Sequence, residues 1–306
     1  MLNTPIRKAV IPVAGLGTRM LPFSKAVPKE MLPVGNKPLI QHAVEEAVSS
    51  GIEEIILVAA PGRNIIQEYF ERNLSLEKVL ERRGRHSEAE TIRSLSHGAS
   101  IRVALQEQPL GLGHAVGCAH DLVGGEPFVM ILPDALILAV RPCLRQLIDC
   151  YKRFPGSYVA TREVGVEELG RFGILRVLPV NDSQQSAQLY RVEGLVEKPA
   201  PEAAPSRFGI FGRYLFTPEI FSYLERVEPD RNHEIQITDA LALYCRDLPL
   251  YALCFEGDHY DVGNKLGFLQ ASVAVGLADP EAGDAFHKFL QTAASGQWSV
   301  ASAKRC

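Results

Sequence analysis

The run Ala9-Val10-Ile11-Pro12-Val13 leads directly into Ala14-Gly15-Leu16-Gly17-Thr18-Arg19-Met20-Leu21-Pro22. A buried strand that ends in a glycine-bearing loop is typical of the ligand-binding edge of an α/β sheet. The two glycines let the backbone approach a ligand closely and adopt positive φ angles. Arg19 and Lys29 add two cations to the same long connection, which suits a polyphosphate. The stretch therefore predicts a strand followed by an anion-binding loop.

The spacing of this loop excludes two familiar nucleotide-binding motifs. A P-loop needs Gly, four residues and then Gly-Lys-Ser or Gly-Lys-Thr, and the chain holds no such string. A dinucleotide fingerprint, Gly-x-Gly-x-x-Gly, needs a third glycine where Met20 stands, and Pro22 and Pro28 oppose the helix that should start there. A nicotinamide-dependent oxidoreductase is therefore disfavoured. An ordinary tight turn stays open as the alternative, but three cations in the loop favour an anion site: Arg19, Lys25 and Lys29.

Composition narrows the class of protein. The formal net charge of −4 argues against a general nucleic-acid binder, which would usually be basic. The six cysteines form no Cys-x-x-Cys pair and no zinc spacing, so we expect buried thiols in a reducing compartment. No signal peptide or membrane-spanning run is visible, because Pro133 and Asp134 interrupt the longest apolar stretch, Phe128–Val140. We expect a cytoplasmic protein without nucleic-acid or membrane partners.

Short apolar strands alternate with amphipathic helices through the first half of the chain. The expected strands are Ala9–Val13, Glu54–Ala59, Ile101–Leu105 and Phe128–Leu132. The expected helices are Leu39–Ser50, Arg63–Phe70, Ala115–Asp121 and Leu144–Phe154. This order predicts an α/β protein whose mostly parallel sheet is covered by helices on both faces. Ligands of such sheets bind at the carboxyl ends of the strands.

The second half of the chain is richer in strands. The expected strands are Tyr158–Arg162, Ile174–Leu178, Leu189–Val196, Phe208–Phe216 and Leu250–Phe255. We expect helices after Thr217-Pro218, after Thr238 and over Asn264–Leu277. The charge-rich helical stretch Leu74–Leu95 looks like an insertion, and we expect the tail 291–306 to be flexible.

Two carboxylates follow strands at positions suited to a metal ion. Asp134 comes directly after the strand Phe128–Leu132, and Asp261 follows the strand Leu250–Phe255. Mg²⁺ usually takes one or two carboxylates and completes its shell with phosphate oxygens and water. Each residue is equally explained as the N-cap of a following helix. Spacing alone does not show whether the two side chains converge.

Other polar residues stand where strands end or helices begin. Lys198 could stabilise charge on a transferring phosphoryl group, and Glu197 could accept hydrogen bonds from sugar hydroxyls, although a strand-end Glu-Lys pair is more often only solvated. Gln106 offers a donor and an acceptor that can read a pyrimidine imide edge, just before the helix start at Gly111. Gly173 allows either close approach of a sugar or a bend in a strand.

Taken together, these motifs resemble the bacterial UTP–glucose-1-phosphate uridylyltransferases, also called UDP-glucose pyrophosphorylases. The resemblance covers the chain from Lys8 to about Gly276, and its specificity comes from an ordered series rather than from one motif. The series comprises Ala9–Pro22, Pro28–Pro33, Lys37–Gln41, Gly111–Ala115, Ile131–Asp134, Val196–Pro199, Glu234–Ala240 and Asp261–Lys265.

The resemblance implies a role for each matching residue. The proposed catalytic residues are Arg19, Lys29, Asp134, Lys198 and Asp261. The implied nucleotide-binding residues are Ala14, Gly15, Gly17, Thr18, Gln106 and Gly111. Glucose 1-phosphate would be bound by Gly173, Glu197 and Lys198, and Mg²⁺ by Asp134 and Asp261.

The family also implies an architecture. It is a Rossmann-like mixed, mostly parallel sheet with helices on both faces, plus a smaller sugar-binding and C-terminal part. A single nucleotidyltransferase domain would span about 1–280, with a nucleotide-binding half over about 1–155, a sugar-binding half over about 156–262 and a C-terminal helix over about 264–290. A homodimer or a homotetramer is expected.

Two alternatives stay open at this point. The same chemistry could use dTTP or another sugar 1-phosphate, although the dTTP branch usually reads Ala-Gly-Gly-x-Gly-Thr-Arg, whereas here Leu16 follows Gly15 directly. A catalytically silent paralogue could bind a nucleotide sugar and regulate a partner. The presence of all five charged site residues disfavours that reading.

Overall fold

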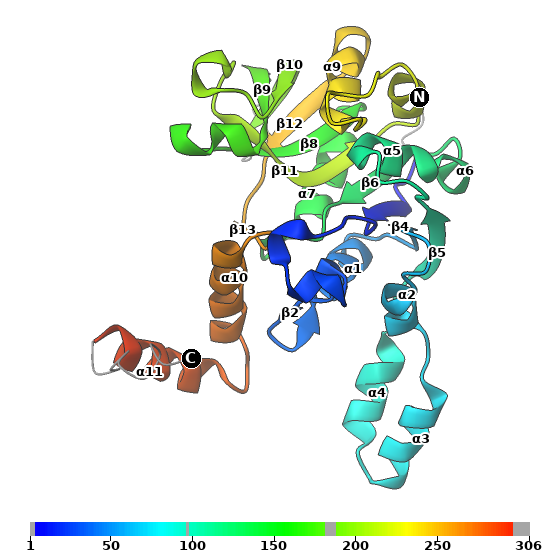
Figure 1. Ribbon diagram of the computed structural model, residues 1–306, viewed down its shortest axis with the longest axis vertical. Coiled ribbons are helices and arrows are strands. Elements are labelled where there is room, and N and C mark those ends of the chain that lie inside the picture. The colour runs from blue at the N-terminus through cyan, green and yellow to red at the C-terminus, as the bar shows by residue number, and fades with distance from the viewer. Residues whose placement is uncertain (1–3, 96–97, 181–187, 296–306) are drawn as a thin grey trace.

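The computed structural model describes residues 4–95, 98–180 and 188–295. A nine-stranded sheet lies at its centre (Figure 1), in the order β5, β4, β1, β6, β11, β8, β12, β10, β9. Taken in that order, the strands are Ser100–Leu105, Glu54–Ala59, Lys8–Pro12, Phe128–Ile131, Phe208–Phe216, Ser157–Glu163, Leu250–Cys254, Leu189–Glu197 and Gly173–Pro179. Every strand that the apolar runs predict is therefore confirmed.

The direction of pairing changes halfway through the sheet. β5, β4, β1 and β6 pair in parallel, because helical connections return the chain to the same edge after each strand. From β11 onwards the pairs are antiparallel, except that β8 and β12 pair in parallel. The covering helices are α1 (Leu39–Ser49), α2 (Ile65–Phe70), α5 (Gly111–Cys118), α6 (His120–Val123), α7 (Cys143–Tyr151), α8 (Ile220–Leu224) and α9 (Ile237–Asp247). The predicted mixed α/β sheet is confirmed.

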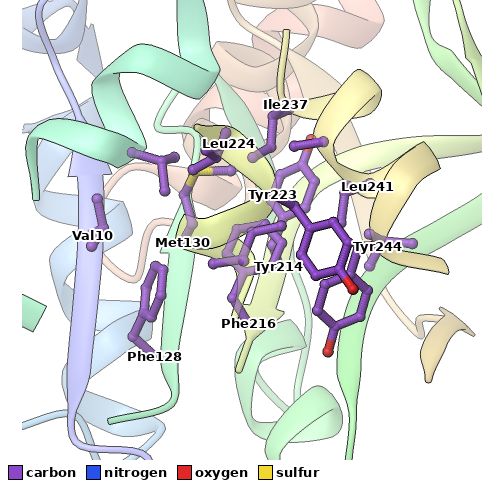
Figure 2. Packing of buried hydrophobic residues seen from close by; sticks show 14 of the residues in the cluster. Val10, Phe128, Met130, Tyr214, Phe216, Tyr223, Leu224, Ile237, Leu241 and Tyr244 are labelled. Carbon is purple, nitrogen blue, oxygen red and sulfur yellow. The ribbon is translucent and has the colours of Figure 1, made fainter. Parts of the chain in front are cut away.

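Alternate residues of the same strands feed two hydrophobic cores. On β1, Val10 packs in a cluster with α5, α8 and α9, whereas Ile11 packs in a cluster with α1 and α7. On β6, Met130 likewise packs in the first cluster and Ile131 in the second. Figure 2 shows the first of these clusters. Because side chains of a strand point alternately to its two faces, these fully apolar strands require helices on both sides.

Two short strands that the sequence analysis missed form a separate ladder. β7 (Ala135–Leu138) and β13 (Asp258–Asp261) pair antiparallel, with Asp261 opposite Ala135. Each strand has four residues, too few to show a hydrophobic period. A second small ladder joins Pro33–Val34 (β2) to Lys37–Pro38 (β3).

The predicted insertion forms an arm of two helices, α3 (Leu74–Arg82) and α4 (His86–Ser94), which projects beyond α2 (Figure 1). The turn between them contains Gly84 at φ +73°, a conformation that favours glycine. The buried carboxylate of Glu77 holds the arm together, since it pairs with Arg72 from the preceding loop and with Arg93 of α4. The arm is thus an ordered projection rather than a core element.

The chain ends in two helices rather than one. α10 (Lys265–Leu277) begins at Asn264, whose side chain accepts a hydrogen bond from the Gly267 amide at 2.9 Å. α11 (Gly283–Ala294) follows, so the first residues of the expected tail are helical, and 296–306 lie outside the described residues. Within the described ranges, no helix is long and apolar enough to cross a membrane.

Candidate active site

Two cavities adjoin at the carboxyl ends of the parallel strands. The first, about 560 Å³, is lined by the glycine loop together with Gln106 and Gly111, and is called the glycine-loop cavity below. The second, about 730 Å³, is lined by Glu197 and Lys198 among others, and is called the Glu197 cavity. Asp134 lines both. A group transferred between ligands in the two cavities would therefore pass Asp134.

Close packing at Gly17 and two hydrogen bonds to backbone carbonyls hold the glycine loop in place. Gly17 adopts φ +65°, and a Cβ there would lie 3.1 Å from the Cβ of Ser24 and 3.3 Å from that of Lys29. The Ser24 hydroxyl donates to the Gly17 carbonyl at 2.7 Å, and Arg63 donates to the Gly15 carbonyl at 2.9 Å. Three 3₁₀ turns follow before α1 starts, so no helix begins in the loop. This agrees with the exclusion of a dinucleotide fingerprint.

Lys29 and Asp134 form an ion pair at the junction of the cavities. Burial favours the neutral form of Asp134, but the charge and hydrogen bond of Lys29 outweigh it and hold the pKa of Asp134 below its usual range. Burial likewise opposes the charge of Lys29, yet Asp134 and Glu30 raise its pKa. Both groups are therefore charged at neutral pH.

The β7–β13 ladder brings Asp261 to the same place. The Val262 amide donates to the Asp134 carbonyl at 2.8 Å, directly beyond the last pair of the ladder. A Cβ added at Gly263 would lie 3.0 Å from Asp261 Oδ1 and 3.2 Å from Asp134 Oδ2. The two carboxylates thus face the same point, and spacing alone could not show this.

The cap alternatives for these two acids are wrong. A strand, β7, follows Asp134 rather than a helix. The side chain of Asp261 accepts from the Gly263 amide at 3.1 Å, but Asn264 caps α10. Neither carboxylate is used to start a helix, and both instead face charged groups of the site.

Cations surround the carboxylate pair. Arg171 donates to Asp261 at 2.8 Å, and Arg19 lies 3.8 Å from the same oxygen. No group of three or more metal-ligating side chains occurs in the part of the chain that the structure describes. Two carboxylates without further protein ligands fit a hard cation whose remaining ligands are phosphate oxygens and water. The donor set therefore fits Mg²⁺ accompanying a phosphate compound.

The Glu197 cavity brings together the three residues assigned to the sugar phosphate. β9 and β10 pair so that Gly173 lies opposite Glu197. A Cβ at Gly173 would lie 2.8 Å from Thr238 and 3.2 Å from Glu197 Oε2, so a side chain there would close the cavity. Lys198 has φ 43°, is held by its amide hydrogen bond to Phe172 at 3.0 Å, and pairs with Glu197 at 3.0 Å. Its half-exposed ammonium is available to a ligand.

Contacts with α5 orient the side chain of Gln106. Its amide nitrogen donates to the Gly111 carbonyl at 3.1 Å and lies 3.0 Å from His114 Nδ1. The amide oxygen has no hydrogen-bond partner among the described residues, and the side chain lines the glycine-loop cavity. Gly111 itself has φ +93°, and a Cβ there would meet the Ile235 carbonyl at 2.8 Å. These contacts place an acceptor at the cavity wall and give His114 a positioning contact.

A buried ion pair supports the turn that carries Asp134. Arg213, 1% exposed in the middle of β11, donates to both carboxylate oxygens of Glu46 and, at 3.1 Å, to the Leu132 carbonyl. Glu46 also accepts from the Leu144 amide at the start of α7. Removing one partner of such a pair is strongly destabilising, typically by about 3–5 kcal/mol. The pair therefore ties α1, α7 and β11 to the turn before Asp134.

Four residues of the site had no role in the sequence analysis. An arginine inside an apolar strand run was a signal for Arg213, and Arg171 stands two residues before Gly173 in the chain. Glu30 and Tyr214 gave no comparable signal, because a glutamate in a loop and a tyrosine in a strand are both common. Glu30 is 1% exposed, and its Oε2 has no hydrogen-bond partner among the described residues.

Comparison with known proteins gives a consistent result. A family model described as "Nucleotidyl transferase" matches residues 8–276. A Bacillus subtilis (strain 168) protein named UTP--glucose-1-phosphate uridylyltransferase YngB is 42% identical over 280 residues, 92% of this chain and 93% of its own. A second protein of that organism, named UTP--glucose-1-phosphate uridylyltransferase, is 43% identical over 286 residues, 94% of this chain and 96% of its own.

Solved structures agree. A UTP-bound UGPase from Acinetobacter baumannii has a TM-score of 0.86 and 36% identity, covering 94% of this chain and 99% of its own. A UDP-glucose pyrophosphorylase complexed with UDP-glucose has a TM-score of 0.80 and 36% identity, covering 89% of this chain and 98% of its own.

Glu30 makes folding stability depend on pH. Burial raises the pKa of its carboxyl to about 7, although the positive charge of Lys29 lowers this pKa in part. The folded protein therefore keeps a proton that the unfolded chain releases, so stability falls as pH rises from about 4.5 to about 7, by up to roughly 3 kcal/mol. Glu30→Gln should lose this fall in urea unfolding measured from pH 5 to pH 8.

Glu53→Gln, at an exposed position, is the control and should keep the wild-type pH dependence. An identical pH dependence in Glu30→Gln and wild type would contradict the assignment.

Proposed function

This chain belongs to the nucleotidyl transferase family, and we propose that it transfers the uridylyl group of UTP to glucose 1-phosphate, forming UDP-glucose and pyrophosphate. The observation that carries the proposal is the position of Asp134 at the junction of two cavities, with Asp261 facing it. The names of the relatives, at about 40% identity over most of the chain, support UTP and glucose 1-phosphate as the substrates.

The glycine-loop cavity suits the nucleotide. The free amide oxygen of Gln106 can accept the imide N–H of uracil, while backbone groups of Ala14, Gly15 and Gly111 line the same cavity. Gly17, Thr18 and Lys29 line this cavity, while Arg19 lines the Glu197 cavity beside Asp261. Lys29 and Arg19 bind the departing phosphates from these two sides. The nucleotide's α-phosphorus would then lie close to Asp134.

The Glu197 cavity suits the sugar phosphate. Glu197 accepts hydrogen bonds from sugar hydroxyls, the absence of a side chain at Gly173 leaves room for the ring, and Lys198 binds the phosphate. The phosphate oxygen is already an anion at neutral pH, so it attacks the α-phosphorus without a general base. Pyrophosphate leaves on the opposite side, towards Lys29.

The protein contributes alignment and charge rather than a covalent intermediate. Lys198 and Lys29 offset negative charge on the two sides of the reacting phosphorus. Nucleotidyl transferases of this kind generally use a divalent metal ion, and we propose Mg²⁺, held by Asp134 and Asp261. When bound, Mg²⁺ would neutralise charge on the phosphate oxygens.

The proposal is tested by measuring pyrophosphate release from the purified protein with Mg²⁺ and a panel of nucleotides and sugar 1-phosphates. UTP with glucose 1-phosphate should be the preferred pair. Preference for dTTP or for another sugar would overturn the substrate assignment. Binding without turnover of any pair would favour a silent nucleotide-sugar-binding protein.

In the same assay, Asp134→Ala and Lys198→Ala should each lower turnover by about two orders of magnitude or more, since losing one such electrostatic group typically costs roughly 2.7–4 kcal/mol of barrier. Asp149→Ala and Lys37→Ala are matched controls, because both side chains form ion pairs away from the cavities. Near-normal turnover in a folded Asp134→Ala or Lys198→Ala protein would overturn the role of that residue.

We also propose that a second copy of the chain covers α10. One side of this helix packs on the chain through Phe268, Ala271 and Val275. The other side exposes an apolar stripe at helical spacing, comprising Leu266, Leu269, Val273 and Leu277. A helix that is apolar all round is normally buried on both sides, and a stripe of this kind marks an interface.

Leu269→Asp should shift the mass measured by light scattering from an oligomer to a monomer, because the charge would be buried at the interface. Val140→Asp, at a fully exposed position outside α10, should keep the wild-type mass. A monomeric wild-type protein, or an unchanged mass in Leu269→Asp, would contradict the proposal.

A further inference from the structure

Tyr214 is a buried phenol without a hydrogen-bond partner among the described residues. Its side chain is 4% exposed. Three other buried tyrosines are paired: Tyr158 donates to the Phe154 carbonyl, Tyr244 lies 2.8 Å from the Thr217 hydroxyl, and Tyr223 donates to Asp247 at 2.9 Å. Tyr151 also has no hydrogen-bond partner among the described residues, but it borders neither cavity. Buried hydroxyls in proteins normally have a partner, so an unpaired one at a cavity points to a ligand.

The fold holds Tyr214 at the wall of the Glu197 cavity. Tyr214 lies in β11, opposite Met130 of β6 and Val159 of β8, so the backbone is paired on both sides. Its ring packs against Phe216 at a centroid distance of 5.4 Å, within the cluster shown in Figure 2. The side chain also lines the Glu197 cavity. The ring is thus packed on the core while the residue borders the cavity.

The charges around Tyr214 define what it can bind. Burial raises the pKa of the phenol, and the nearby carboxylates of Glu197 and Asp134 raise it further, so the hydroxyl stays protonated. These two carboxylates accept hydrogen bonds and repel an anion, whereas a protonated phenol donates. A phosphate placed between them needs donors. Three cations line the cavity, and each already faces a carboxylate: Lys198 pairs with Glu197, and Arg171 and Arg19 pair with Asp261.

We propose that the Tyr214 hydroxyl donates a hydrogen bond to the phosphate of the sugar 1-phosphate in the Glu197 cavity. The assignment rests on the proposed function, and adds a substrate-binding residue to it. Tyr214, which is buried, and Lys198, which is half exposed, then both bind the phosphate. A phenol also adds no charge to a site where the attacking oxygen must stay anionic.

Tyr214→Phe tests this directly, because it removes the hydroxyl and keeps the ring and its packing. With UTP saturating, kcat/KM for glucose 1-phosphate should fall by about tenfold to a hundredfold, the usual range for a hydrogen bond to a charged group. The KM for UTP should change less than twofold. The melting temperature should be unchanged or higher, because an unpaired buried hydroxyl is removed.

Tyr158→Phe is the matched control. Its hydroxyl is paired with backbone and borders neither cavity, so this variant should lose stability and keep kcat/KM. A Tyr214→Phe protein with kcat/KM for glucose 1-phosphate within twofold of wild type, beside an active wild type, would overturn the Tyr214 assignment alone. A wild type that does not turn over UTP with glucose 1-phosphate would overturn the proposed function and this assignment with it.

Discussion

The antiparallel pairing of β7 with β13 is the constraint on which the site depends. It places Asp261, from the last part of the sheet-forming chain, beside the turn that carries Asp134. The buried Arg213–Glu46 pair supports the same turn, because Arg213 also donates a hydrogen bond to the Leu132 carbonyl. Because both supports act on backbone, the carboxylates are aligned before any ligand arrives. Such preorganisation is what a reaction without a covalent intermediate requires.

This arrangement explains why the two cavities work together. The parallel first half of the sheet ends at the glycine loop, and the antiparallel second half ends at Glu197 and Gly173. β6 and β11, the strands that join the halves, carry Asp134 at the end of one and Tyr214 in the other. The two cavities, which we propose hold the nucleotide and the sugar phosphate, are therefore lined by different parts of the sequence but share one wall.

Much of the fold could be predicted from the sequence, because its strands are apolar runs that feed two cores. The short β7 and β13 could not be, since four residues show no period and their pairing depends on tertiary contacts. The sequence pointed to site residues where a residue type has a distinct chemistry at a strand end or in a loop. Lys29 and Gln106 are examples, and both line the glycine-loop cavity. Glu30 and Tyr214 were missed because their significance lies in where they are buried: Glu30 Oε2 has no hydrogen-bond partner in the described part of the chain, and Tyr214 lines the Glu197 cavity. Only three-dimensional contacts reveal this.

The central claim is that Asp134 and Asp261 act as a pair on one metal ion. Binding of Mn²⁺, followed by electron paramagnetic resonance in the presence of UDP-glucose, tests it most directly. Asp134→Asn and Asp261→Asn should each weaken Mn²⁺ binding at least about tenfold, and the double variant should be little worse than either, because neighbouring ligands of one ion are not additive. Wild-type affinity in either single variant would contradict the claim.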